Sequence, residues 1–139
     1  VTHAYPKSFH LMKNLTVLRT EMFYSVMRPY SEAARRERMR KFSDVVGLRA
    51  GDRILDLGGS MQLWTLIDLP LEITLVNLPG SFSSLGTFDH PPHRFTFLEH
   101  DACRVDEITE PGYDLVFCNS VIEHVGGPKQ QRELAEQIR

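Results

Sequence analysis

The stretch "ILDLGGSMQLW", from Ile54 to Trp64, decides the fold of this chain. Its first residues are apolar and end at an acid, Asp56, after which Gly58 and Gly59 follow. A short apolar run of this kind is typical of a buried strand. Adjacent glycines let the backbone turn sharply and approach a ligand closely. The stretch therefore predicts a strand, a glycine turn and a helix, which is the opening unit of an α/β sheet.

Further short apolar runs follow along the chain. They are rich in Ile, Val, Leu and Phe without strict alternation, as expected for parallel strands buried on both faces. The predicted strands are Arg53–Leu57, Ile73–Leu78, Arg94–Leu98 and Tyr113–Cys118. The predicted connections are a helix at Ser60–Leu69, a short helix or irregular turn at Ser81–Phe88, a crossover around Cys103–Ile108 and a helix from Pro128. This alternation predicts an α/β fold.

Two amphipathic helices are predicted before the first strand. Apolar residues recur at helical spacing over Ser8–Met27, and a second helix runs from Ser31 to a stop at Gly47. Residues 1–50 carry ten Lys/Arg and four Asp/Glu, whereas residues 51–139 carry six and fourteen. We therefore expect a basic helical cover at 1–50 and an acidic α/β domain at 51–139.

Composition excludes several classes of protein. Cys103 and Cys118 lie in different predicted elements and lack CxxC spacing, which predicts free thiols in a reducing compartment. No apolar run has the roughly 20 residues of a membrane span, and the first residues do not resemble a signal peptide. We expect a cytoplasmic protein. His90 and His93 flank two prolines without a nearby cysteine or acid cluster, so no metal site is predicted.

The residues at the strand ends resemble a known family. "ILDLGGS", "ITLVNLP", "FLEHDA" and "YDLVFCNSVIEHV" are similar, in order, to motifs I to IV of class I S-adenosylmethionine-dependent methyltransferases of the type 11-like kind. The resemblance covers roughly residues 50–127. It implies a Rossmann-like partial parallel sheet, with the first four of the family's seven strands. We therefore expect either a fragment of a longer protein or a second copy that covers the strand edge at Tyr113–Cys118.

The resemblance also implies how S-adenosylmethionine would be bound. The implied cofactor-binding residues are Asp56, Gly58, Gly59, Ser60, Asn77, Leu78, Asp101, Ala102, Asn119 and Ser120. The two glycines would let backbone amides approach the methionine part, and Asp56 would face its amino group. Asp101 and the Ala102 amide would contact the adenine.

Three positions depart from the family pattern. The family usually places an acid at the second strand end to hold both ribose hydroxyls, whereas this chain has Asn77. An amide accepts one hydrogen bond and donates another but lacks the charge of a carboxylate. Ser60 and Gln62 stand where the family has glycines. Ser60 is predicted to be a helix N-cap, which would satisfy amides that otherwise face a ligand.

Catalytic residues are not specified by these motifs, and Glu123 and His124 are the candidates. Histidine is the residue type most often used as a general base, but His124 also suits the start of the last helix. The basic cluster Arg35–Lys41 fits a solvated helix face, with an acidic methyl acceptor as the functional alternative. No aromatic residues interleave with it, so a nucleic-acid partner is not expected.

The leading hypothesis is methyl transfer to a small-molecule, sugar or lipid acceptor. Asn77, Ser60 and Gln62 also leave open a non-catalytic methyltransferase-like binding or assembly protein. A nicotinamide enzyme is the third hypothesis, because Asn77 lies near the spacing of a ribose-binding acid. The sequence has no Gly-x-Gly-x-x-Gly motif after the first strand, which speaks against this third hypothesis.

Overall fold

The computed structural model describes residues 31–108 and 112–138. The chain divides into two units, Val1–Arg38 and Met39–Arg139. In the first unit the described residues, 31–38, are helical, and the helix continues in the second unit to residue 46. It ends before Gly47, as the sequence predicted, although Ser31 already lies within it. The helix predicted at Ser8–Met27 lies outside the described residues.

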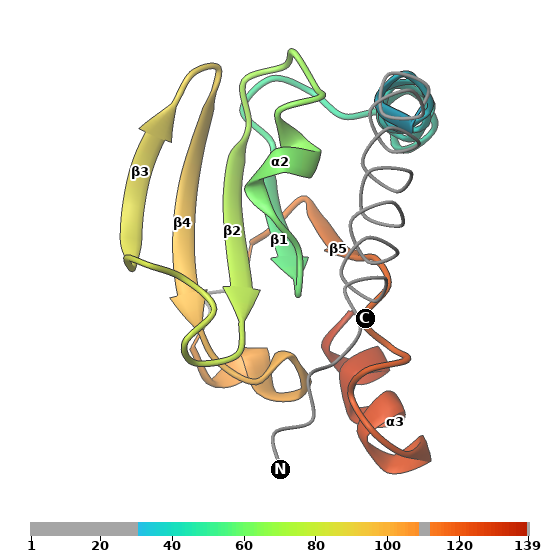
Figure 1. The fold of residues 1–139 in the computed structure, drawn as a ribbon, viewed down its shortest axis with the longest axis vertical. Coiled ribbons are helices and arrows are strands. Elements are labelled where there is room, and N and C mark those ends of the chain that lie inside the picture. The colour runs from blue at the N-terminus through green and yellow to red at the C-terminus, as the bar shows by residue number, and fades with distance from the viewer. Residues whose placement is uncertain (1–30, 109–111, 139) are drawn as a thin grey trace, which may run out of the picture. The chain divides into compact units, whose positions relative to one another are not determined.

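The second unit is built on a five-stranded sheet (Figure 1). The strands are β1 (Arg53–Leu57), β2 (Glu72–Asn77), β3 (Gly86–His90), β4 (His93–Glu99) and β5 (Leu115–Cys118). Their order is β3-β4-β2-β1-β5, and β1 pairs in parallel with both β2 and β5. β2 and β4 are also parallel. The α/β class and the four predicted parallel strands are confirmed, each to within a residue or two at its ends.

β3 was missed by the sequence prediction. It pairs antiparallel with β4 across the tight connection at Pro91–Pro92, and all five of its residues are exposed. The expected helix or irregular turn at Ser81–Phe88 is therefore wrong for its last residues. An exposed edge strand buries too little apolar surface to leave a hydrophobic pattern. The Thr87 and Thr96 hydroxyls, 3.0 Å apart, link the two strands instead.

The helices of the second unit are short. α2 (Met61–Trp64) is only four residues long, whereas a helix was expected over Ser60–Leu69. After Trp64 the hydrogen bonds span three residues, from the Leu66 amide to the Leu63 carbonyl oxygen and from the Ile67 amide to the Trp64 carbonyl oxygen, so the α-helix gives way to tighter turns. The crossover from β4 is the 3₁₀ helix η1 (Ala102–Glu107), and α3 (Pro128–Gln137) follows β5.

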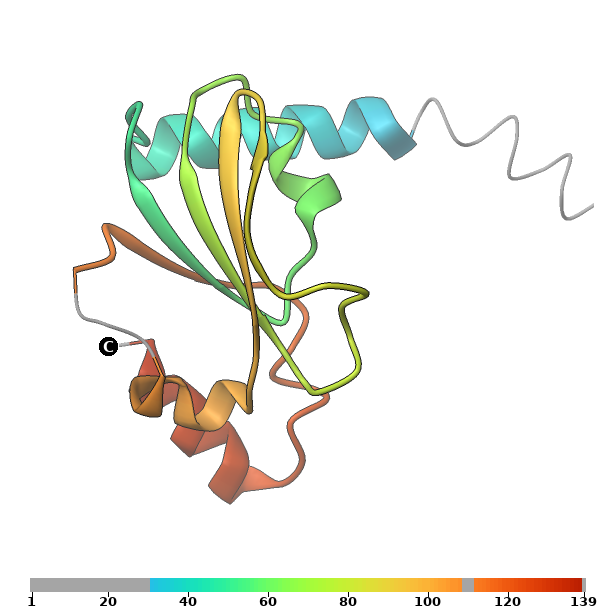
Figure 2. The same ribbon diagram turned by 90° about the vertical axis from the view of Figure 1, so that its left-hand side faces the viewer.

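Each face of the sheet has its own apolar cluster, as the two-residue period of a strand dictates. On one face Ile54, Ile73 and Phe95 pack with Trp64 of α2 and with Met39 of the N-terminal helix. On the other face the buried residues are Leu55, Leu57, Val76, Ala102, Cys103, Val105 and Leu134. The second cluster is closed by η1 and α3, which pack against each other near the carboxyl ends of the strands (Figure 2).

Candidate functional site

A cavity of about 380 Å³ lies at the carboxyl ends of the parallel strands. This volume falls within the ~300–1,000 Å³ common for small-molecule sites. Many of the residues predicted to bind a cofactor line it: Gly58, Asn77, Leu78, Asp101, Ala102 and Ser120. The candidate catalytic residue His124 lines it as well, whereas Asp56, Gly59, Ser60, Asn119 and Glu123 do not. The fold thus brings together residues that are up to 72 positions apart, from Gly58 to Gln130.

Gly58 lines the cavity directly after β1. Its amide donates a 2.8 Å hydrogen bond to the carbonyl oxygen of Val76, and its φ is +75°. A Cβ at this position would overlap the side chain of Val121. Glycine is therefore required here both for the backbone conformation and for the close approach of Val121.

Asp56 is buried below the glycine turn and does not reach the cavity. Its side chain is 0% exposed, and Oδ2 accepts a 2.7 Å hydrogen bond from the indole nitrogen of Trp64. Burial raises the pKa of Asp56 to about 6, although the hydrogen bond from Trp64 lowers it. A Cβ on Gly59 would overlap this carboxyl group, so Gly59 serves the packing of Asp56. The expected contact of Asp56 with a ligand amino group has no support in this arrangement.

Asn77 is held by the same turn. Its Nδ2 donates a 2.9 Å hydrogen bond to the carbonyl oxygen of Gly59, which leaves Oδ1 without a partner among the described residues. Asn77 therefore contacts the cavity while its donor group is already used within the protein. A carboxylate could not make this hydrogen bond, because it has no proton to donate.

Ser60 does not cap α2 as predicted. It occupies the N-cap position with extended backbone, but its side chain makes no capping hydrogen bond. The first turn is closed instead by the carbonyl oxygen of Ser60, which accepts a 3.2 Å hydrogen bond from the Leu63 amide. With only four residues, the helix has few amides that require a side-chain cap.

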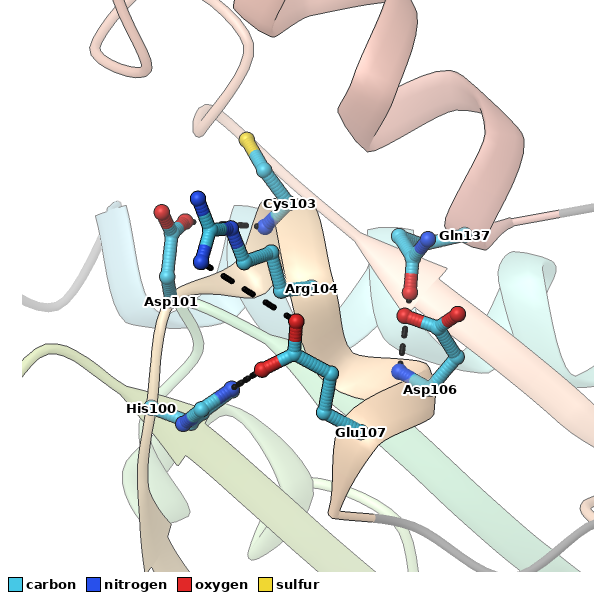
Figure 3. A network of polar contacts seen from close by, with 7 residues as sticks. All are labelled: His100, Asp101, Cys103, Arg104, Asp106, Glu107 and Gln137. Carbon is cyan, nitrogen blue, oxygen red and sulfur yellow. Dashed lines mark hydrogen bonds and ion pairs between the residues drawn. The ribbon is translucent and has the colours of Figure 1, made fainter.

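Asp101 lines the cavity and is the N-cap of η1, where Figure 3 shows it beside Cys103 and Arg104. Its Oδ1 accepts a 2.9 Å hydrogen bond from the Cys103 amide and so caps the helix. The Asp101 side chain also interacts with the Cys103 thiol, and the residue as a whole is exposed. Glu107 of the same helix pairs with His100 at 3.3 Å and with Arg104 at 4.0 Å. The helix is thus fixed at both ends, and the exposed residue Asp101 lines the cavity where η1 begins.

Glu99 anchors the loop after β2. Its Oε1 accepts hydrogen bonds from the amides of Gly80, at 2.9 Å, and Phe82, at 3.2 Å. This loop begins at Leu78, whose side chain is 63% exposed and lines the cavity. An exposed apolar side chain at the rim of a cavity is suited to contact a flat apolar ring.

The loop after β5 supplies the remaining wall. Ser120 lies in the left-handed region, with a φ of 58°, which is strained for a residue other than glycine. It is followed by a turn in which the His124 amide donates a 2.8 Å hydrogen bond to the Val121 carbonyl oxygen. This turn brings His124 to the cavity and leaves Glu123 outside its lining.

Sequence reasoning missed His100, Cys103 and Gln130, which also line the cavity. His100 adjoins Asp101 in the "FLEHDA" stretch, so its position was a usable signal. Cys103 and Cys118 are free thiols, as predicted. Burial, followed by the charge of Asp101, raises the pKa of Cys103, whose Sγ donates to the carbonyl oxygen of Gln130 at 3.4 Å. Cys103 is therefore a protonated wall residue rather than a nucleophile at neutral pH.

The described residues contain no cluster of three or more His, Cys, Asp or Glu that could hold a metal ion. His93 is buried at the start of β4. No helix within the described ranges is long and apolar enough to cross a membrane. In the basic cluster, Arg35, Arg36 and Arg38 are exposed, and Arg40 forms a 2.9 Å ion pair with Asp44.

Comparisons of the chain with protein-family models, with curated proteins and with solved structures found no match. The resemblance of the strand-end motifs to methyltransferases therefore stays a prediction.

Proposed function

We propose that this chain binds S-adenosylmethionine at the carboxyl ends of its parallel strands and takes part in methyl transfer. The observation that carries the proposal is the cavity between the ends of β1, β2 and β4 and the loop after β5. Its lining combines the turn glycine Gly58, the apolar rim residue Leu78 and the exposed acidic residue Asp101. Sheets of this kind bind ligands at this edge.

The residues present fit the parts of this cofactor. Gly58 lines the cavity beside Val121, and Oδ1 of Asn77 can accept one hydrogen bond from a ribose hydroxyl. Oδ2 of Asp101 can accept from the exocyclic amine of adenine while Oδ1 keeps η1 capped. When bound, S-adenosylmethionine supplies a methyl group activated for attack by a nucleophile.

The contribution of the protein to the reaction would be mainly to align the two reactants. His124 is the candidate to accept a proton from a hydroxyl acceptor, because it lines the cavity and Glu123 does not. A small-molecule, sugar or lipid acceptor remains the proposed substrate class, with a second copy at the β5 edge as a proposed partner.

One observation favours the alternative of a non-catalytic binding or assembly protein. Asp56 and Asn77, which the family resemblance assigns to the cofactor, both make hydrogen bonds within the protein. A site that has lost cofactor binding would retain these internal contacts. Direct measurement of binding separates the two proposals.

Calorimetric titration with S-adenosylhomocysteine, the reaction product, tests the proposal, with NAD as the competing ligand. We expect micromolar binding of S-adenosylhomocysteine and none of NAD. Asp101→Asn retains the oxygen that caps η1 but loses the charge, so it should weaken binding about tenfold without unfolding the helix. Asp106→Asn removes the same charge from an exposed residue of η1 outside the cavity lining and should bind like the wild type. Absence of binding to the wild type would refute the proposal.

A further inference from the structure

The side chain of Asn77 joins two strand ends that are 18 residues apart in the sequence. Its Nδ2 donates a 2.9 Å hydrogen bond to the carbonyl oxygen of Gly59, in the turn that follows β1. The atom that faces the Gly59 carbonyl oxygen must be a hydrogen-bond donor. An ionised acid at position 77 would place a negative oxygen against the carbonyl oxygen and leave it unpaired.

The side chain of Asp56 also leaves no room for a side chain at Gly59. A Cβ on Gly59 would overlap the Asp56 carboxyl group, and that carboxyl group is fixed by the indole of Trp64. The adjacent Gly58 amide is bonded to Val76, the residue before Asn77. We call Asn77, Gly59, Asp56 and Trp64 the glycine clamp. Its geometry links the end of β2, the turn after β1 and α2.

We propose that Asn77 is a positioning residue whose amide holds the Gly58–Gly59 turn in the conformation that shapes the cavity, so that an acid at this position would release the turn. The amide of Asn77 then has a role of its own in holding the turn. Asn77 is not what remains of an acid that once bound ribose. The effect on the turn is independent of any ligand. Only the effect on S-adenosylhomocysteine binding rests on the proposed function.

Acidic residues lie around position 77, so the effect of an aspartate introduced there should depend on pH. An aspartate there would lie beside Glu99, its neighbour on β4, with Asp56 on β1 and Asp101 at the start of η1. His100 and His124 are the other titratable groups that share the cavity lining with Cys103. These acids favour protonation of an introduced aspartate in mild acid, and a protonated carboxyl group can again donate to Gly59.

Trp64 is the only tryptophan of the chain, so its fluorescence reports directly on the clamp. At pH 8 we expect Asn77→Asp to shift the emission of Trp64 to longer wavelength and to lower the urea midpoint, because water reaches the indole when the turn opens. At pH 5 both values should return toward those of the wild type. The wild type is measured at each pH, since Asp56 itself titrates near 6.

Gln62→Glu is the matched control, because it makes the same amide-to-acid change at an exposed position of α2. Its emission should match the wild type throughout. Wild-type emission and midpoint for Asn77→Asp at pH 8 would overturn the proposal. If Asn77→Asp does not fold at any pH, Asn77→Ala replaces it. Asn77→Ala should show shifted emission at every pH, and wild-type emission would overturn the proposal.

Titration with S-adenosylhomocysteine separates this inference from the proposed function. At pH 8 the Asn77→Asp variant should bind about tenfold more weakly than the wild type, as expected for loss of a part-buried hydrogen bond that holds the turn. Tighter binding by Asn77→Asp would overturn the role of Asn77 and uphold the proposed function. Absence of binding to the wild type would refute the proposed function, while the emission of Trp64 would still decide the role of Asn77.

Discussion

The indole nitrogen of Trp64 donates a 2.7 Å hydrogen bond to Oδ2 of Asp56, and both side chains are fully buried. The other carboxylate oxygen, Oδ1, has no partner among the described residues. A buried carboxylate with one donor is costly to ionise, which explains the raised pKa of Asp56. Asp56, which precedes the glycine turn, is thus part of the core. Its titration makes the stability of the fold depend on pH.

Replacing Trp64 with phenylalanine should destabilise the chain more at neutral pH than in acid. The variant removes the hydrogen bond that Trp64 donates to the Asp56 carboxyl group, the one side-chain donor to it among the described residues. Its loss raises the pKa of the carboxyl group further and costs about 2–3 kcal/mol when the group is ionised. Urea unfolding followed by circular dichroism at pH 7.5 and pH 5 measures the difference. Phe117→Leu is the control, because Phe117 contacts the ring of Trp64 without a polar partner. If Trp64→Phe lowered the free energy of unfolding equally at both pH values, the proposed role of the hydrogen bond to Asp56 would be wrong.

Asp56 should make the free energy of unfolding fall as the pH rises from about 4 to about 6. Its pKa is raised from 3.8 to about 6 in the folded state, so the folded state keeps a proton that the unfolded state has released. At about 1.4 kcal/mol per pH unit, the fall reaches about 3 kcal/mol. In Asp56→Asn this fall should disappear. Unfolding curves at half-unit pH steps provide the measurement, and an unchanged profile in the variant would count against the assignment.

His93 should have the opposite effect. Its side chain is buried, and desolvation lowers the pKa of the ring below 6.5, against the smaller effects of the Ile67 and Trp64 backbone. As the pH falls, His93 therefore binds a proton more readily in the unfolded state than in the folded state. Stability is lost as the pH falls below 6.5. His93→Phe retains a ring beside Phe95 and should lose less stability than the wild type between pH 7 and pH 5. A larger acid loss in the variant would refute this prediction.

Gly59→Ala should destabilise the chain by at least about 2 kcal/mol, because its Cβ would overlap the buried Asp56 carboxyl group. Gly127→Ala is the matched control, since a Cβ there makes only ordinary contact with Gln130. Thermal unfolding of both variants compares the two sites. Equal midpoints would show that the turn has room for a side chain.

The parallel sheet was predictable because each of its strands is a short apolar run, and the cavity followed because parallel strands end at one edge. The strand-end rule indicated where to look, and the resemblance of the strand-end motifs to methyltransferases implied Gly58, Asn77 and Asp101 as cofactor-binding residues. β3 could not be found in the same way, since an exposed edge strand such as Gly86–His90 has no buried face.

The internal contacts of the site were also not predictable. The pairing of Asp56 with Trp64 depends on where a four-residue helix ends, and the sequence favoured a longer helix. The hydrogen bond from Asn77 to Gly59 depends on the distance between two strand ends, which the pattern of apolar residues does not specify. Ser60 has the right residue type for a cap, yet α2 is too short to need one.

Amide NMR spectra of the ¹⁵N-labelled chain, titrated with S-adenosylhomocysteine, test the central claim most directly. We predict shifts of the backbone signals of Gly58, Asp101 and Ala102 and of the Asn77 side-chain amide, all at the carboxyl ends of the strands. Gly51, before β1 at the opposite end of the sheet, should remain unchanged. Absence of shifts at saturating ligand, or shifts confined to the region of Gly51, would contradict a cofactor site at this edge.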